Sequence, residues 1–374
     1  QQRVIGVVSR ALSAVDEWDA VLACARNPHL QLVFSNTTEV GIVLDEDDRP
    51  DASPPRSFPG KLTRFLLERA RTFDFDPARG VVVLPCELID DNGDRLRQIV
   101  LALAERWGLD PRFGGWITAA VPFCNTLVDR IVPGTPAADA RAEAEAALGY
   151  RDELRARLPF AGLPGVTVTE DVAPYRERKV RMLNGAHTIT VPAAILAGCQ
   201  TVLDAVHHPV IGPFLRRALL DEIVPTLDAP GSEAYARAVL DRFANPCVKH
   251  ALHDISLQQT MKMRVRVVPT IVRYAERTAR VPGALAFGFA AYLRMVREGL
   301  GLPDDQAERV RGHWSRLGDG AEPDVARAVC GDEGLWGTDL SAVPGFAAAV
   351  AGALVRMRRH GVAAALEQQI GAAA

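Results

Sequence analysis

The sequence predicts an α/β protein in which a partial, Rossmann-like doubly wound sheet domain over residues 1–170 is followed by an all-α domain over residues 171–374. In the first part, short Val/Leu-rich runs typical of buried strands alternate with helical patterns, as in parallel sheets with crossover helices. After Thr190 the apolar residues recur almost entirely at the helical period, with Pro or Gly between segments. A chain of 374 residues is long enough for two such cores.

The elements of the first domain follow from this alternation in order. We expect helices over 14–27, 60–72 and 94–107, strands over 30–36 and 80–86, a short connection over 107–116, a surface helix over 137–153 and a last strand over 162–172. The change of period places the domain boundary between 167 and 172.

Composition indicates an ordinary globular protein, with 48% apolar and 24% charged residues and a formal net charge of −3. This balance gives no reason to expect nucleic acid or a membrane surface as a partner, and no apolar run reaches the roughly 18 residues of a spanning helix. The six cysteines are dispersed without a C-x-x-C, which argues against disulfides and a zinc knuckle. A cytoplasmic protein is the natural expectation.

A lysine, a carboxamide and an imidazole lie close together in one helical stretch, at Lys179, Asn184 and His187. On an α-helix Asn184 would lie about 140° and His187 about 80° round from Lys179, so all three can face one cavity. Lysine can hold a tunable proton, and the other two can hydrogen-bond substrate oxygens. An amphipathic helix with a polar stripe is the alternative, and for an arbitrary pattern of this kind it is the more frequent one.

Polar residues follow both predicted strands of the first domain, where ligands of open parallel sheets bind. Asn36, Thr37 and Glu39 follow the first strand, and Glu87 and Asn92 follow the second. Ordinary strand exits with capping Asn and Thr, and an Asn-Gly turn at Asn92, are the alternatives.

Several runs together resemble a known family: RKVRMLNGAHT around the lysine, SNTTEVGI, LPCELIDDNGD, NTLVDRIVP from Asn125, and RFANP from Arg242. They are similar to the mannitol dehydrogenase family of polyol-specific long-chain dehydrogenases, and the second and third runs narrow the resemblance to its tagaturonate reductase branch. The resemblance implies a zinc-independent, NAD-dependent oxidoreductase that interconverts D-tagaturonate and D-altronate in hexuronate catabolism. Fructuronate reductase and a mannitol-type dehydrogenase are the alternatives within the family.

The resemblance also implies roles for the candidate residues. Lys179 would be the general acid/base, Asn184 and Asn125 would donate hydrogen bonds to the reacting oxygen, and His187 would bind the substrate. The residues implied near the nicotinamide are Asn36, Thr37, Glu39, Glu87 and Asn92. A free lysine, with a reference pKa of about 10.4, is a poor base near neutral pH, so this role requires burial or neighbouring cations.

A uronate carries a carboxylate, so a cation should lie near it. Lys262 is the first choice and Arg264 the second, and a basic helix entrance facing water is the alternative. The pairs His250/His253 and His207/His208 lack a third ligand at suggestive spacing, so we expect no metal.

The sequence departs from the family at one point, because no G-x-G-x-x-G precedes the first strand. Either that amino-terminal part is left out of this chain or the chain is a genuine truncation. A genuine truncation would favour a non-catalytic interaction module, which is our alternative prediction outside the enzymes. The residue that separates NAD from NADP would lie upstream of residue 1, so NAD is implied by the family alone.

Overall fold

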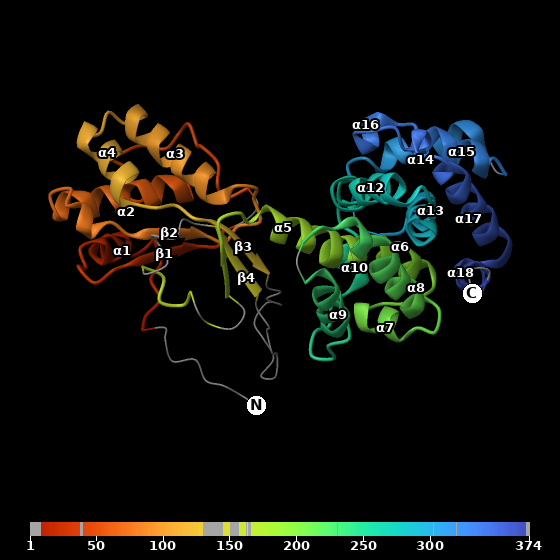
Figure 1. The fold of residues 1–374 in the computed structure, drawn as a ribbon. Helices are drawn as coiled ribbons and strands as arrows, with labels where there is room; N and C mark the ends of the chain where they lie inside the picture. Colours follow the sequence, from red (N-terminus) through yellow and green to blue (C-terminus); the bar gives the residue numbers. More distant parts are fainter. Residues whose placement is uncertain are drawn as a thin grey trace. The chain divides into compact units, whose positions relative to one another are not determined.

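The structure, a computed structural model, describes residues 9–37, 40–129, 145–149, 157–161, 163, 166–229, 231–301, 303–318 and 320–371. The chain folds into two compact units, which we call unit 1 (residues 1–175) and unit 2 (residues 176–374), shown in Figure 1. The division falls inside helix α5 (Ala173–Lys179), a few residues beyond the boundary expected from the sequence.

Unit 1 is an α/β unit, as predicted. Its elements are α1 (Trp18–Ala25), β1 (Leu32–Ser35), α2 (Phe58–Thr72), η1 (Pro77–Arg79), β2 (Val82–Pro85), α3 (Asn92–Arg106), α4 (Pro111–Ala120), β3 (Asn125–Asp129), β4 (Glu145–Gly149) and β5 (Val166–Thr169). Strands β1 and β2 are parallel, β3 and β4 are antiparallel, and β4 and β5 are parallel. A parallel bridge from Val83 to Phe123 connects β2 with the segment that leads into β3.

Strand β2 is buried on both faces, as in a doubly wound sheet. Val81 and Val83 pack into the apolar cluster formed with α2, α3 and α4, the helices above the β1–β2 pair in the view of Figure 1. Val82 and Leu84 point to the opposite side and pack with Cys124 and Leu158. This alternation explains the uninterrupted apolar run that predicted the strand.

Helix α4 corrects the expectation of a short connection over 107–116. Asp110 caps it by accepting a 2.9 Å hydrogen bond from the backbone N–H of Arg112, and Pro111 occupies the first turn. Phe113, Trp116 and Ile117 bury one face of the helix. The Asp-Pro start and the i, i+3, i+4 apolar spacing were present in the sequence.

The surface helix predicted over 137–153 is wrong where the structure describes that range. Residues 145–149 form β4, which pairs with β3 on one side and β5 on the other. Pairing with two neighbours outweighs the helix propensity of an Ala/Glu-rich stretch, which amounts to only tenths of a kcal/mol per residue. The remainder of the range, 137–144 and 150–153, lies outside the described residues.

Unit 2 is helical, as predicted, and its described β-structure is limited to an isolated bridge between Thr201 and Ala251. Its elements after α5 are η3 (Val180–Gly185), α6 (Ala186–Leu196), α7 (Val202–His207), α8 (Ile211–Arg217), η4 (Ala218–Ile223), η5 (Val224–Thr226), α9 (Ser232–Phe243), α10 (Leu252–Ile255), α11 (Gln259–Lys262), η6 (Met263–Val267), α12 (Val268–Thr278), α13 (Gly283–Arg297), α14 (Ala307–Leu317), α15 (Glu322–Cys330), α16 (Glu333–Trp336), η7 (Leu340–Ala342), α17 (Phe346–His360) and α18 (Val362–Gly371). The segments η3, η4 and η6 are π-helices. Among the described helices, none combines the length and apolar character needed to cross a bilayer.

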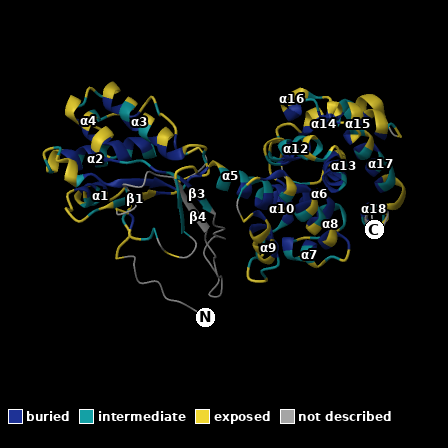
Figure 2. Ribbon diagram, viewed as in Figure 1, coloured by how far each residue is buried: buried dark blue, intermediate teal, exposed yellow. Residues whose placement is uncertain are grey.

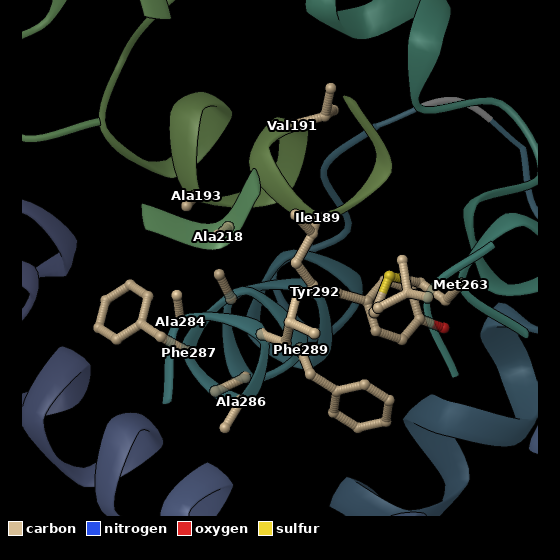
Figure 3. Packing of buried hydrophobic residues seen from close by; sticks show 14 of the residues in the cluster. Ile189, Val191, Ala193, Ala218, Met263, Ala284, Ala286, Phe287, Phe289 and Tyr292 are labelled. Atoms are coloured by element: carbon tan, nitrogen blue, oxygen red, sulfur yellow. The ribbon is translucent and has the colours of Figure 1, made fainter. Parts of the chain in front are cut away.

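Helix α13 is the centre of unit 2 and is buried along nearly its whole length, as the dark blue ribbon in Figure 2 shows. Figure 3 shows Phe287, Phe289 and Tyr292 of α13 together with Ile189 of α6. A Cβ added at Gly288 would lie 2.4 Å from Cγ1 of Ile189, so α6 and α13 touch where only glycine fits.

Glu222, in the π-helix η4, caps the buried start of α13. Its carboxylate accepts hydrogen bonds from the backbone N–H groups of Ala284 (2.7 Å) and Leu285 (2.8 Å). Burial raises the pKa of Glu222 to about 7, although these two hydrogen bonds act in the opposite direction. Glu222 is therefore structural.

The raised pKa of Glu222 predicts a pH-dependent contribution to stability. Between about pH 4.5 and 7 the folded state keeps a proton that the unfolded state has lost, so the free energy of unfolding contributed by this group falls as pH rises. We expect the difference in unfolding free energy between wild type and Glu222→Gln, measured by urea denaturation, to decrease across this window and then to level off. A difference that grows with pH would contradict the assignment.

Candidate active site

The ends of β1 and β2 and the start of β3 lie level with one another. Ser35 of β1 is opposite Pro85 of β2, and the parallel bridge pairs Val83 with Phe123. Asn125, two residues beyond Phe123, therefore lies level with Pro85. The described predicted residues Asn36, Thr37, Glu87 and Asn125 are thus brought to one carboxyl edge, where dinucleotides bind in such sheets.

Glu87 ties the loops after β1 and β2 together. It is buried and accepts hydrogen bonds from Oγ of Ser35 (2.9 Å), from the backbone N–H of Thr37 (2.9 Å) and from Oγ1 of Thr37 (2.8 Å). Asn36 and Thr37 are exposed at the edge, whereas Glu39 lies outside the described residues. Glu87 positions the loop, and Asn36 and Thr37 are available for a ligand.

Asn92 is fully buried and organises the β2–α3 loop. Its Nδ2 donates to the carbonyl oxygens of Pro85 (3.0 Å), Glu87 (3.0 Å) and Thr126 (3.1 Å). Its Oδ1 accepts from the backbone N–H groups of Gly93 and Thr126, at 2.9 Å each. The turn role that the sequence left open is therefore what the structure shows, and Asn92 has no exposed surface for a cofactor.

Asn125 is half-buried at the start of β3, and Asp94 holds its carboxamide. Its Oδ1 accepts from the backbone N–H of Asp94 (3.1 Å), and its Nδ2 donates to Oδ2 of Asp94 (2.8 Å). An amide nitrogen carries two hydrogens, so this bond fixes the group and leaves one hydrogen for a substrate. Gly93 permits the approach, because a Cβ there would lie 2.5 Å from the carbonyl of Cys124.

In unit 2, the π-helix η3 follows Lys179 and contains Asn184. Lys179 is buried, and η3 begins at the next residue. A π-helix has hydrogen bonds between residues five apart in sequence. Residues i and i+5 are therefore separated by a smaller angle around its axis than the roughly 140° of an α-helix. The sequence prediction assumed an α-helix over these residues, and the π-helix η3 corrects that assumption.

His187, in the first turn of α6, is buried in an aromatic setting. Its ring stacks on the ring of Phe243, with centroids 3.9 Å apart and planes at 14°. It also forms an edge-to-face contact with the ring of His250, with centroids 5.4 Å apart. Its Nε2 is buried and has no hydrogen-bond partner in the structure. A buried nitrogen of this kind is costly unless water or a ligand satisfies it, and a hydroxyl or carbonyl oxygen of a bound molecule would do so.

The imidazole of His187 is neutral near physiological pH. Burial is the largest cause that lowers its pKa well below 6.5, followed by the charges of His250, Arg266, Arg242 and Lys262. Burial also lowers the pKa of His250. His187 can therefore serve as a hydrogen-bonding group rather than as a cation.

The cations near His187 include one of the two that were predicted to bind the substrate carboxylate. Lys262 acts on His187 and donates from Nζ to the carbonyl of Ile255 at 2.8 Å. Arg264 is exposed and lies against Gly337, the residue that follows α16. Arg266, which sequence reasoning passed over, is the arginine of this run that acts on His187. The sequence feature that could have indicated Arg266 is its position four residues after Lys262, a spacing that places two residues on one face of a helix.

Pro192 explains the hydrogen bond that holds Gln259 beside α6. Proline has no N–H, so it leaves the carbonyl of Thr188, four residues earlier, without its helical donor. Nε2 of the buried Gln259 donates to that carbonyl at 2.7 Å. This contact ties α11 to the turn that follows His187.

The described residues contain no group of three or more His, Cys, Asp or Glu that could hold a metal ion. All six cysteines are free, and burial raises the pKa of Cys86 and of Cys124 to about 11, so both are neutral thiols.

A sheet unit whose polar loops share one carboxyl edge, followed by a helical unit that carries a buried lysine, a carboxamide and an unpartnered imidazole, is the arrangement expected of a two-domain dinucleotide-dependent oxidoreductase. Residues 1–157 match the model of the mannitol dehydrogenase Rossmann domain, and residues 171–358 match that of the mannitol dehydrogenase C-terminal domain. The chain belongs to the mannitol dehydrogenase family, whose members act on CH–OH groups.

Relatives with assigned names are similar over most of the chain. The altronate oxidoreductase of Bacillus subtilis (strain 168) is 41% identical, covering 98% of this chain and 81% of the relative. That of Klebsiella pneumoniae (strain 342) is 41% identical, covering 92% and 77%. A D-sorbitol dehydrogenase structure in substrate-free form matches with a TM-score of 0.70 and 25% identity, over 94% of this chain and 78% of that one. The Pseudomonas fluorescens mannitol 2-dehydrogenase, solved with NAD and D-mannitol, supports the fold with a TM-score of 0.65 at 24% identity, over 98% and 80%.

The contact between Pro192, Gln259 and Thr188 generates a stability prediction. Gln259→Leu removes the donor to the buried Thr188 carbonyl and should lower the free energy of unfolding by about 1–3 kcal/mol. In a Pro192→Ala background the restored helical N–H can bond the same carbonyl, so the cost of Gln259→Leu should be clearly smaller. Urea denaturation of wild type, Gln259→Leu, Pro192→Ala and the double variant measures this coupling. Equal costs in both backgrounds would show that the Gln259 contact does not compensate for Pro192.

Proposed function

We propose that the protein is an NAD-dependent altronate oxidoreductase, which interconverts D-tagaturonate and D-altronate. The named relatives, about 40% identical over nearly the whole chain, support the substrate. The observation that carries the chemistry is the buried, unpartnered Nε2 of His187 on the same helical segment as the buried Lys179. The dispersed free cysteines support a reducing, cytoplasmic setting.

The carboxyl edge of unit 1 fits a dinucleotide. Asn36 and Thr37 are exposed there, and Glu87 fixes the loop that carries them. When bound, the nicotinamide supplies or accepts the hydride, and the protein must orient the substrate and manage one proton. NAD rather than NADP is our proposal, supported by the family.

Lys179 is proposed to give a proton to the ketone oxygen during reduction and to remove it during oxidation. Its burial supports this role, because removal from water disfavours an ammonium relative to a neutral amine. Asn184, the fifth residue after Lys179 in the segment that contains η3, would donate a hydrogen bond to the same oxygen as negative charge develops on it. Asn125 stays our prediction for the amide that unit 1 contributes.

His187 is proposed to bind a hydroxyl of the sugar acid. The ring is fixed by Phe243 and stays neutral, so Nε2 can form one hydrogen bond without a change of charge. Lys262 and Arg264 stay predictions for the carboxylate, and the exposed position of Arg264 makes it the weaker of the two. No step in this scheme requires a bound metal.

A substrate panel tests the proposed function. The purified protein should oxidise NADH with D-tagaturonate. Its kcat/KM for D-tagaturonate should exceed that for D-fructuronate, which lacks the proposed configuration, and that for D-fructose, which lacks the proposed charge. The decrease in NADH absorbance measures each rate, with NADPH as the comparison cofactor. A higher kcat/KM for D-fructuronate would transfer the assignment to fructuronate reductase, and no oxidation with any of the three would favour a non-catalytic interaction module.

The assigned roles predict different kinetic effects for Lys179 and His187. Lys179→Ala should lower kcat by roughly 10²–10⁴-fold, the usual scale for a general acid/base, whereas His187→Ala should mainly raise KM for the sugar acid. Lys249→Ala, at an exposed lysine, is the matched control and should leave both constants near those of wild type. Near wild-type kcat in Lys179→Ala, or an unchanged KM in His187→Ala, would refute the corresponding role.

A further inference from the structure

Arg266 borders the helical segment that carries Asn184 and His187. The π-helices η3 and η6 meet here, because a Cβ added at Gly185 would lie 3.3 Å from the carbonyl oxygen of Arg266. The guanidinium of Arg266 reaches the next turn, with Nη1 3.4 Å from Oγ1 of Thr188. Both the main chain and the side chain of Arg266 therefore lie beside the proposed substrate-binding residues.

Other cations converge on the same place from different elements. Arg242 precedes Phe243, the residue whose ring stacks on His187, and Lys262 comes from α11. Arg242, Lys262 and Arg266 all act electrostatically on His187, while Asp254 is the carboxylate that acts on His250. An anionic ligand beside His187 would be attracted by each of these positive charges.

A carboxylate suits this group of cations better than a neutral hydroxyl does. The guanidinium is planar, and its parallel N–H groups match the two oxygens of a carboxylate. Arg266 is half-buried, so water screens its charge less than that of the exposed Arg264.

Resting on the proposed function, we propose that Arg266, assisted by Arg242, binds the carboxylate of the sugar acid and so selects sugar acids over neutral ketoses. This subsite lies beside His187. Lys262 is then left to contact the sugar chain or to keep its bond to the carbonyl of Ile255.

The test compares an anionic and a neutral substrate in the same variants. KM and kcat are measured for D-tagaturonate, D-fructuronate and neutral D-tagatose with NADH, in wild type, Arg266→Gln and Arg266→Lys. Arg327→Gln, which removes an exposed arginine of α15, is the control for loss of one positive charge. Circular dichroism of each variant shows whether the fold is retained.

For Arg266→Gln we expect KM for D-tagaturonate to rise roughly 10- to 100-fold, the scale of one lost charge-assisted hydrogen bond, with kcat within about threefold. Arg266→Lys should recover most of this loss, and any rate with D-tagatose should change less than about threefold. Loss of kcat without a change in KM, equal losses for charged and neutral substrates, or an unchanged KM would overturn the subsite.

The failure of the subsite can be told apart from the failure of the proposed function. If wild type reduces D-fructuronate instead of D-tagaturonate, and Arg266→Gln raises KM for D-fructuronate, the substrate assignment fails and the carboxylate subsite stands. If wild type reduces D-tagaturonate and Arg266→Gln has an unchanged KM, the function stands and the subsite fails. If wild type reduces neither hexuronate, both fail.

Discussion

The close contact between α6 and α13 at Gly288 is the constraint on which the site in unit 2 depends. Helix α13 is buried along nearly its whole length, and α6 lies against it at a point where a side chain larger than hydrogen would collide with Ile189. Ile189 is two residues from His187, so this contact sets the depth of the imidazole in the unit. Glu222 accepts hydrogen bonds from the backbone N–H groups at the buried start of α13, which have no donor-acceptor partner within the helix.

The π-helices give unit 2 a geometry that ordinary helices would not. Asn184 belongs to η3, and Arg266 belongs to η6, where its carbonyl oxygen approaches Gly185 of η3. Such segments are less stable than α-helices and are frequent at functional sites, because they redirect side chains without ending the helix. The flanking helices and the contact of Gln259 with the Thr188 carbonyl hold this arrangement in place.

Unit 1 uses polar side chains to shape loops. Glu87 and Asn92 are buried and satisfied by main-chain groups and by the hydroxyls of Ser35 and Thr37, so they are scaffolding for the residues that remain exposed. Asp94 fixes the carboxamide of Asn125 in a similar way, by a hydrogen bond. A buried polar group must be hydrogen-bonded, and here this requirement joins the ends of β1 and β2 and the start of β3 into one edge.

The sequence by itself determined the two-part architecture, because the change from strand–helix alternation to helical periodicity is written in the order of apolar residues. It also placed Lys179, Asn184 and His187 on one continuous helical segment, which is why we predicted them as one group. Tertiary structure alone decided that residues 145–149 form a strand, that Asn92 is internal, and that Arg266 rather than Arg264 lies beside His187. These outcomes depend on contacts between segments distant in the chain, and such contacts leave no local periodicity to read.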